Sequence, residues 1–106
     1  MSAPAQRTFN CGSPVGGPVG TRQTPAEALD YTAVIDPSNA DTIASATWSI
    51  NPTSATVGSP TTNSAASTVL VSGMTVGHSY ALIALLTGTS GQIYSGTILI
   101  NCVAYR

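Results

Sequence analysis

The sequence carries very little charge. Charged residues make up 7% of the 106 residues, against about 25% in an ordinary soluble domain, and lysine is absent. The formal net charge is −1, from three arginines and four acidic residues. Because nucleic acids and anionic membrane surfaces are bound mainly through clustered Lys and Arg, neither is expected as a partner.

Long hydrophobic runs are also missing. The longest apolar stretch, residues 80–86, is much shorter than the ~20 residues that cross a bilayer as a helix. The sequence therefore predicts no membrane-spanning helix. An apolar content of 42% at near-zero net charge is instead typical of a chain that folds around a core, and the length suits one domain.

Residues that carry catalytic chemistry are scarce, with one His, four carboxylates and two Cys in the whole chain. His78 lies in a turn sequence before the apolar run, where a surface histidine is the usual interpretation, and no partner for it stands out. The Gly-x-Ser-x-Gly motif of a serine nucleophile does not occur. We therefore expect no enzymatic activity and no cofactor.

Three acidic residues, Asp30, Asp36 and Asp41, come closest to a metal-binding pattern. Their spacing does not match a calcium loop, in which acids alternate and a glutamate closes the loop. Asp36 and Asp41 are better explained as caps of turns. The sequence therefore predicts no metal site.

Only two cysteines are present, Cys11 and Cys102, fewer than the four ligands of a structural zinc site. They lie near opposite ends of the chain, and the termini of compact domains are often close in space. A disulfide between them would close a loop of roughly 90 residues and contribute about 4–5 kcal/mol. Two reduced thiols packed in the core are the alternative, and the sequence leaves both open.

The first 25 residues contain Gly and Pro at short intervals and show no periodicity of 2 or 3.6. Proline lacks the amide that a β-ladder needs, and glycine weakens helix and strand alike. We therefore divide the chain into an extended N-terminal arm, residues 1–25, and a folded domain, residues 26–106. A disordered tail and an arm that docks on a neighbouring subunit are the two interpretations of this segment.

Beyond residue 25, short β-branched segments alternate with turn residues. Alternating apolar and polar side chains predict strands over residues 29–35 and 43–50, each followed by a turn that contains proline. Further short strands are predicted over residues 55–57 and 68–72.

The apolar run over residues 80–86 is bounded by glycines, and its shortness favours a central strand covered on both faces over a helix. A last strand over residues 93–103 follows, and the connection between the two suits a hairpin. About six or seven short strands without an amphipathic helix predict an all-β fold, a small immunoglobulin-like antiparallel β-sandwich. Its expected core anchors are Trp48, Tyr80 and Leu82.

Three pieces of the sequence occur in a characteristic order and spacing: TPAEALDY at residues 24–31, DTIASATW at 41–48 and VSGMTVGHSY at 71–80. They resemble small tail-associated proteins of tailed bacteriophages, described as fibre–tail adaptors, and the resemblance extends over residues 24–101. It implies an immunoglobulin-like sandwich in a virion, without catalysis. The closing hairpin of that family usually carries charged residues after its glycine, whereas residues 91–96 here are neutral.

A surface of hydroxyls, amides and small apolar groups is buried at little desolvation cost. Together with the resemblance, this predicts a non-enzymatic structural protein of a tailed-phage virion, made in the cytoplasm of the bacterial host. It would link tail or fibre components through its arm and its sandwich surface. Its expected partners are other virion proteins and copies of itself.

Two alternative functions stay open at the level of the sequence. One is a capsid decoration protein, which would be present in many more copies per particle than a tail adaptor. The other is a glycan-binding module, for which Tyr94 or Tyr105 would supply the exposed aromatic ring that such sites need.

Overall fold

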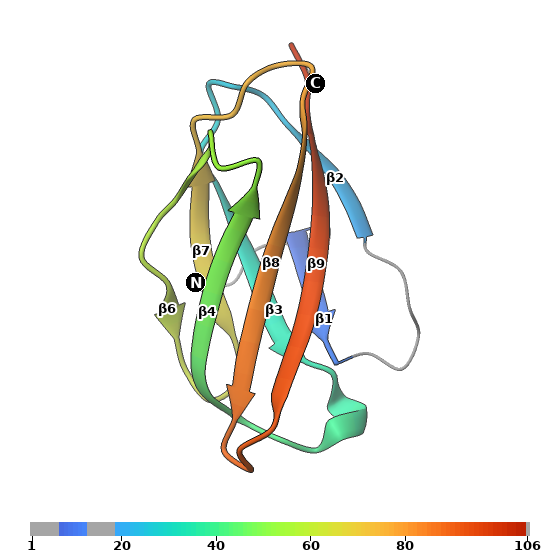
Figure 1. The fold of residues 1–106 in the computed structure, drawn as a ribbon, viewed down its shortest axis with the longest axis vertical. Coiled ribbons are helices and arrows are strands. Elements are labelled where there is room, and N and C mark those ends of the chain that lie inside the picture. The colour runs from blue at the N-terminus through green and yellow to red at the C-terminus, as the bar shows by residue number, and fades with distance from the viewer. Residues whose placement is uncertain (1–6, 13–18, 106) are drawn as a thin grey trace.

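The computed structural model describes residues 7–12 and 19–105, and its fold is drawn in Figure 1. Among these residues the strands form two sheets, and no helix is long and apolar enough to span a membrane. In chain order the elements are β1 (Thr8–Cys11), β2 (Val19–Gln23), β3 (Leu29–Ile35), the 3-10 helix η2 (Pro37–Asn39), β4 (Ile43–Asn51), β5 (Thr56–Val57), β6 (Thr61–Thr62), β7 (Ser67–Ser72), β8 (Ser79–Gly88) and β9 (Ile93–Cys102).

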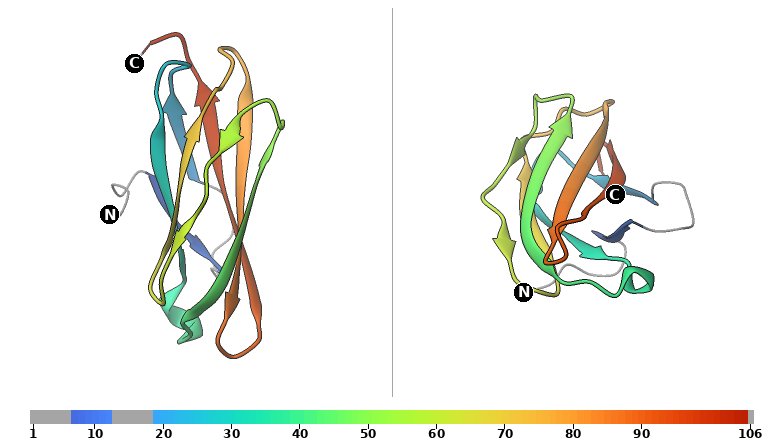
Figure 2. Two further views of the ribbon diagram at one scale, coloured as in Figure 1. Left: turned by 90° about the vertical axis from the view of Figure 1, so that its left-hand side faces the viewer. Right: turned by 60° about the horizontal axis from the view of Figure 1, so that its bottom comes forward.

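The two sheets pack face to face as a sandwich (Figure 2). One sheet has the order β1-β3-β7-β5, with β6 also paired to β7, and the other has the order β2-β9-β8-β4. The prediction of an all-β sandwich is therefore confirmed. The orders β3-β7-β5 and β4-β8-β9 are consistent with those of strands B-E-D and C-F-G in immunoglobulin-type sandwiches.

The core forms where the apolar positions of the alternating strands face one another. In β8 the buried positions are Tyr80, Leu82, Ala84 and Leu86, which face Tyr31, Val69 and Val71 and other buried residues of the opposite sheet's strands. The strand predictions for residues 29–35, 43–50, 68–72 and 93–103 and the hairpin before the last of these are confirmed to within one or two residues.

The three expected core anchors do not lie at equal depth. Tyr80 and Leu82 are fully buried, whereas Trp48 is partly buried and packs against the margin of the core. The Trp48 indole donates a hydrogen bond from Nε1 to Ser67 Oγ at 2.9 Å, and its ring meets the ring of Phe9 edge to face, with centroids 5.8 Å apart. An indole NH needs a hydrogen-bond partner, which favours this position at the margin.

The N-terminal segment differs from the expected arm. In the described part of residues 1–25, β1 and β2 are edge strands of the two sheets, while residues 1–6 and 13–18 lie outside the described residues. Both strands pair in parallel, β1 with β3 and β2 with β9, in contrast to the antiparallel pairing expected throughout. Parallel pairing joins segments that are distant in the sequence, so no local turn signals it.

A buried polar group ties β2 to the opposite sheet. Gln23 is fully buried, and its Nε2 donates hydrogen bonds to the backbone oxygens of Glu27, at 2.9 Å, and Val71, at 2.8 Å. Its Oε1 accepts a hydrogen bond from Tyr31 OH at 2.8 Å. Because a buried amide without partners is costly, these bonds fix the end of β2 in one position.

The two cysteines are free, buried thiols, so of the two alternatives the structure contains the reduced one. Cys11 lies against Gly96 of β9, whereas Cys102 is the last residue of the same strand. An extended strand from residue 96 to residue 102 spans about 20 Å, far more than the ~7 Å between Cα atoms that a disulfide tolerates. The Cys11–Cys102 disulfide is therefore incompatible with this fold.

Candidate interaction surface

The strand β8 is apolar on both faces, but only one face lies in the core. Ala81, Ile83 and Leu85 alternate with the buried positions and point outward, and Leu85 is 41% exposed. The prediction that this strand is covered on both faces is therefore wrong within the described residues. An apolar row on a sheet's outer side is an unusual feature of a protein surface.

Neighbouring strands extend this row into a continuous surface. Leu99 of β9, also 41% exposed, pairs with Ala81, while Leu85 lies between Thr47 of β4 and Ser95 of β9. We call this surface the outer face. It consists of the outward side chains of β4, β8 and β9, namely Ser45, Thr47, Ser49, Asn51, Ser79, Ala81, Ile83, Leu85, Thr87, Ile93, Ser95, Thr97, Leu99 and Asn101.

The outer face carries no charged residue. On this side of the sheet, charged residues lie only at its border in the described part of the chain: Arg22 of the edge strand β2 pairs with Asn101, and Asp41 lies at the tip of the β8–β9 hairpin. Hydroxyl, amide and aliphatic groups are far easier to remove from water than ammonium, guanidinium or carboxylate groups. This side of the sandwich is therefore suited to being buried against another protein.

The tip of the β8–β9 hairpin is anchored to the loop before β4 by Asp41. This carboxylate accepts hydrogen bonds from Ser90 Oγ at 2.5 Å, Tyr94 OH at 2.9 Å and Thr89 Oγ1 at 3.2 Å, and its Oδ1 accepts from the backbone amide of Thr42 at 2.8 Å. We call this group the Asp41 clasp. It holds in place the hairpin that carries Ile93, which is 67% exposed.

The chemistry of the clasp follows from these contacts. The hydrogen bond from Ser90 is the largest of the effects that lower the pKa of Asp41 to about 2, from an ordinary value of 3.8. Burial and the contact with Asp41 raise the pKa of Tyr94. A Cβ at Gly88 would overlap Asp41 Oδ2, so glycine at this position leaves room for the carboxylate.

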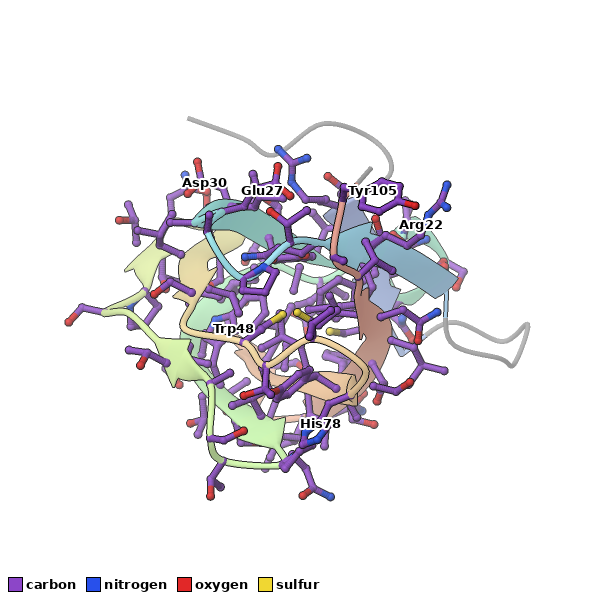
Figure 3. All side chains as sticks on the ribbon, turned by 90° about the horizontal axis from the view of Figure 1, so that it is seen from above. Arg22, Glu27, Asp30, Trp48, His78 and Tyr105 are labelled. Carbon is purple, nitrogen blue, oxygen red and sulfur yellow. The ribbon has the colours of Figure 1, made fainter. Side chains whose placement is uncertain are left out.

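The residues expected for other functions lie apart from one another. Tyr94 is 9% exposed and bonded to Asp41, so it offers no open ring for a sugar, whereas Tyr105 is 85% exposed near the C-terminus (Figure 3). His78 is exposed in the turn before β8, with its ring 6.3 Å from that of Tyr80. The structure does not bring these side chains together into one site.

The acidic residues are also dispersed. Asp36 caps η2 by accepting a hydrogen bond from the amide of Ser38 at 3.0 Å, and Asp41 forms the clasp. Asp30 lines a hollow of about 260 Å³ on the other sheet, beside Thr68 and Leu70. Among residues 7–12 and 19–105, no three His, Cys, Asp or Glu side chains lie close enough together to hold a metal ion.

Both cysteine thiols have low reactivity. Burial raises the pKa of Cys11 to about 12, and burial likewise raises the pKa of Cys102. A thiol must ionise to act as a nucleophile or a metal ligand. These side chains therefore serve the core.

Sequence reasoning missed the outer face and the clasp for different reasons. The apolar continuity of residues 80–86 indicated cover on both sides, but not that residues 7–12 and 19–105 cover only one side. The clasp joins Asp41 to Ser90 and Tyr94, from segments that are distant in the sequence. Only the pairing of strands brings them together.

A comparison with protein families gives one result. The family model described as "Gp77: Podophage GP4 fiber-tail adaptor protein gp77" matches residues 23–101, which include the outer face and the clasp. Neither the curated proteins nor the solved structures gave a match.

Proposed function

Because this chain belongs to the podophage GP4 fiber-tail adaptor family, we propose that it joins tail and fibre proteins through the outer face of its sandwich. Members of this family are structural proteins of the phage virion, and an adaptor binds other tail or fibre proteins. The proposal concerns how this chain does so: which surface it uses, and how its copies are arranged.

The observation that carries the proposal is the uncovered apolar row on β8 and β9. Leu85, Leu99 and Ile93 are 41%, 41% and 67% exposed, although they lie on long, well-paired strands. Burying apolar area contributes roughly 25 cal/mol per Å². Covering this row with a partner therefore stabilises the complex relative to the two separate proteins.

The size of the outer face supports the same conclusion. Three strands of nine or ten residues, spaced about 4.8 Å apart, present roughly 450–500 Å². The adjoining edge strand β2, with five residues, adds roughly 80 Å², so the flat area is about two thirds of the ~800 Å² per partner of an ordinary stable interface. The outer face therefore suits one protein partner better than it suits a small ligand.

The absence of charge sets the chemistry of that partner. A charged partner surface would lose its hydration against Leu85 and Leu99 without gaining an opposite charge. The partner surface is therefore expected to be apolar and rich in hydroxyl or amide groups. The Asp41 clasp keeps the hairpin at the end of this face in one geometry before binding, which reduces the entropy lost on association.

Copies of the chain are proposed to lie side by side in the tail. A net charge of −1 over the whole chain gives little repulsion between neighbours. A tail adaptor requires few copies arranged around the tail, whereas capsid decoration requires many copies over the shell. Counting the copies per particle by quantitative mass spectrometry separates these two arrangements.

The test of the outer face is the substitution Leu85→Asp. It places a carboxylate at the centre of the apolar row, and we expect the chain to fold but to be lost from assembled particles. The matched control is Leu70→Asp together with Asp30→Asn, because Leu70 is 46% exposed on the outer side of the other sheet and pairs with Asp30, whose charge would repel the new carboxylate. Circular dichroism checks folding, and mass spectrometry of purified particles measures incorporation. Normal incorporation of Leu85→Asp, or equal loss of both variants, would contradict the proposal.

A further inference from the structure

The strand β1 occupies a groove that reaches both sheets. It pairs in register with the edge of β3, from Thr32 to Ile35, and its Cys11 side chain reaches the opposite sheet, with Sγ 3.7 Å from the backbone oxygen of Ala84. Gly96 of β9 forms the floor of the groove. We call this groove the β1 seat.

The β1 seat is specific for its occupant. A Cβ at Gly96 would lie 2.7 Å from the backbone oxygen of Asn10 and 2.8 Å from Cys11 Sγ, so β1 fits only against glycine. Phe9 is 4% exposed and Cys11 is fully buried. An empty seat would open the core between the two sheets, so residues 7–12 of some copy must fill it.

The end of β1 is also held by specific hydrogen bonds. The amide of Gly12 donates to the backbone oxygen of Ser95 at 3.0 Å, and the amide of Asp36 donates to that of Cys11 at 2.9 Å. Asn39 Nδ2 donates to the backbone oxygen of Gly12 at 3.0 Å. These contacts would be identical if β1 came from a neighbouring copy.

Little in the local sequence ties β1 to its own sandwich. The family match begins at residue 23, so β1 and nearly all of β2 lie outside the part shared with the family. The register partners of β1, such as Thr8 and Thr32, are far apart in the sequence and pair in parallel. No hairpin therefore obliges β1 to pair with the β3 of the same chain.

The directions of the first two strands favour exchange. β1 runs parallel to β3 and β2 runs parallel to β9, and Figure 1 shows that β1 and β2 run in opposite directions. A chain that fills its own seat must reverse between Gly12 and Val19. In an exchanged copy the same connection leads on to a neighbouring sandwich, and this reversal is not required.

We propose that, in the assembled tail, each copy inserts residues 7–12 into the β1 seat of a neighbouring copy. Exchange of an identical element between protomers forms no new kind of contact, so its free energy differs from that of the closed form mainly through the connection. The seven residues from Gly12 to Val19 reach at most about 24 Å. This is comparable with the shortest axis of the chain, 22 Å, so a neighbour whose seat faces this edge of the sandwich is within reach.

This inference rests on the proposed function in one respect, which is that copies lie next to one another. Held in contact, they present their seats to one another at effective concentrations in the millimolar range, so that a neighbour's seat competes with the seat of the same chain for β1. The exchanged strand would join the copies without any charged contact.

A pair of cysteines tests the exchange in particles built from the full chain. Asn10 and Val34 are register partners on the outer side of their sheet, at a spacing that a disulfide spans. Virions that carry Asn10→Cys and Val34→Cys are treated with a mild oxidant and run without reductant. Exchange predicts species of two or more linked chains. Single chains with an internal bond overturn the proposal, as does the absence of any bond.

The matched control is the pair Ser79→Cys and Asn101→Cys, which are register partners on β8 and β9 inside the family's own region. This pair must give only an internal bond. If the first pair prevents incorporation, electron cryo-microscopy of unmodified virions decides instead: density from Gly12 leads to the β2 of another sandwich, or, against the proposal, to that of the same sandwich. An internal bond would leave the Leu85→Asp result untouched, so the two proposals fail separately.

Discussion

The inner and outer faces of β8 and β9 both carry large apolar side chains, but their environments are opposite. On the inner face Leu82 and Leu86 are fully buried, whereas on the outer face Leu85 and Leu99 are each 41% exposed. Hydrophobicity along a strand therefore does not say what buries it. The inner face stabilises the chain itself, and the outer face is proposed to act when a partner covers it.

The largest expected effect separates the two faces directly. Leu82→Ala removes a fully buried side chain from the centre of the core and is expected to lower the free energy of unfolding by about 2–5 kcal/mol. Leu85→Ala truncates a side chain on the outer face of the same strand and is expected to lower the free energy of unfolding by less than about 1 kcal/mol. Urea unfolding of the isolated chain measures both. Equal losses would show that the two faces do not differ in role.

A smaller effect is expected from two glycines that lie on opposite faces. Gly96→Ala places a Cβ against Asn10 and Cys11 and should lower the free energy of unfolding by about 1–3 kcal/mol, because β1 must shift. Gly20→Ala is the control, since its Cβ would meet only the backbone oxygen of Leu99 at 3.9 Å. If Gly96→Ala leaves the free energy of unfolding unchanged, β1 does not pack closely against the inner face at this position.

The smallest effect concerns the hairpin tip, where Tyr94 of the inner face and Ile93 of the outer face meet. Because the pKa of Asp41 is about 2 in the folded state, below its ordinary 3.8, the clasp contributes stability above pH 4 and loses it as the pH falls toward 2. Asp41→Asn should therefore lower the melting temperature at pH 6 and flatten its dependence on pH between 4 and 2. Asp30→Asn, which removes the same charge from the other sheet, is the control for net charge. Parallel melting curves of Asp41→Asn and wild type across this pH range would contradict the role of the clasp.

The sequence was sufficient for the strands whose own residue pattern is clear, even where their partners are distant. Alternation identified β3, β4 and β9, because half-buried strands place every second side chain in the core, whereas β7 was predicted from a short apolar run followed by a turn. Neither pattern identified β1 and β2, because glycine and proline surround these strands and no local turn signals their parallel pairing. The residue pattern of a segment shows which of its side chains are buried, but not which distant strand it pairs with.

Only part of the candidate site could be predicted from the sequence. The low charge indicated a surface made for burial, and the apolar run at residues 80–86 indicated a second cover. Which face stays open depends on the number of layers in the fold, and a sandwich has only two. Tyr94 shows the same limit: its aromatic ring suggested a sugar platform, but the return of the hairpin places its hydroxyl on Asp41.

The separation of the two cysteines along β9 has a consequence for where the protein can work. Cys11 and Cys102 lie about 20 Å apart by strand geometry and are both buried, so oxidation has no bond to form and reduction none to break. The fold is therefore expected to be the same in the reducing interior of a cell and in an oxidising extracellular environment. No disulfide between these two residues has to form or break when the sandwich passes from one environment to the other.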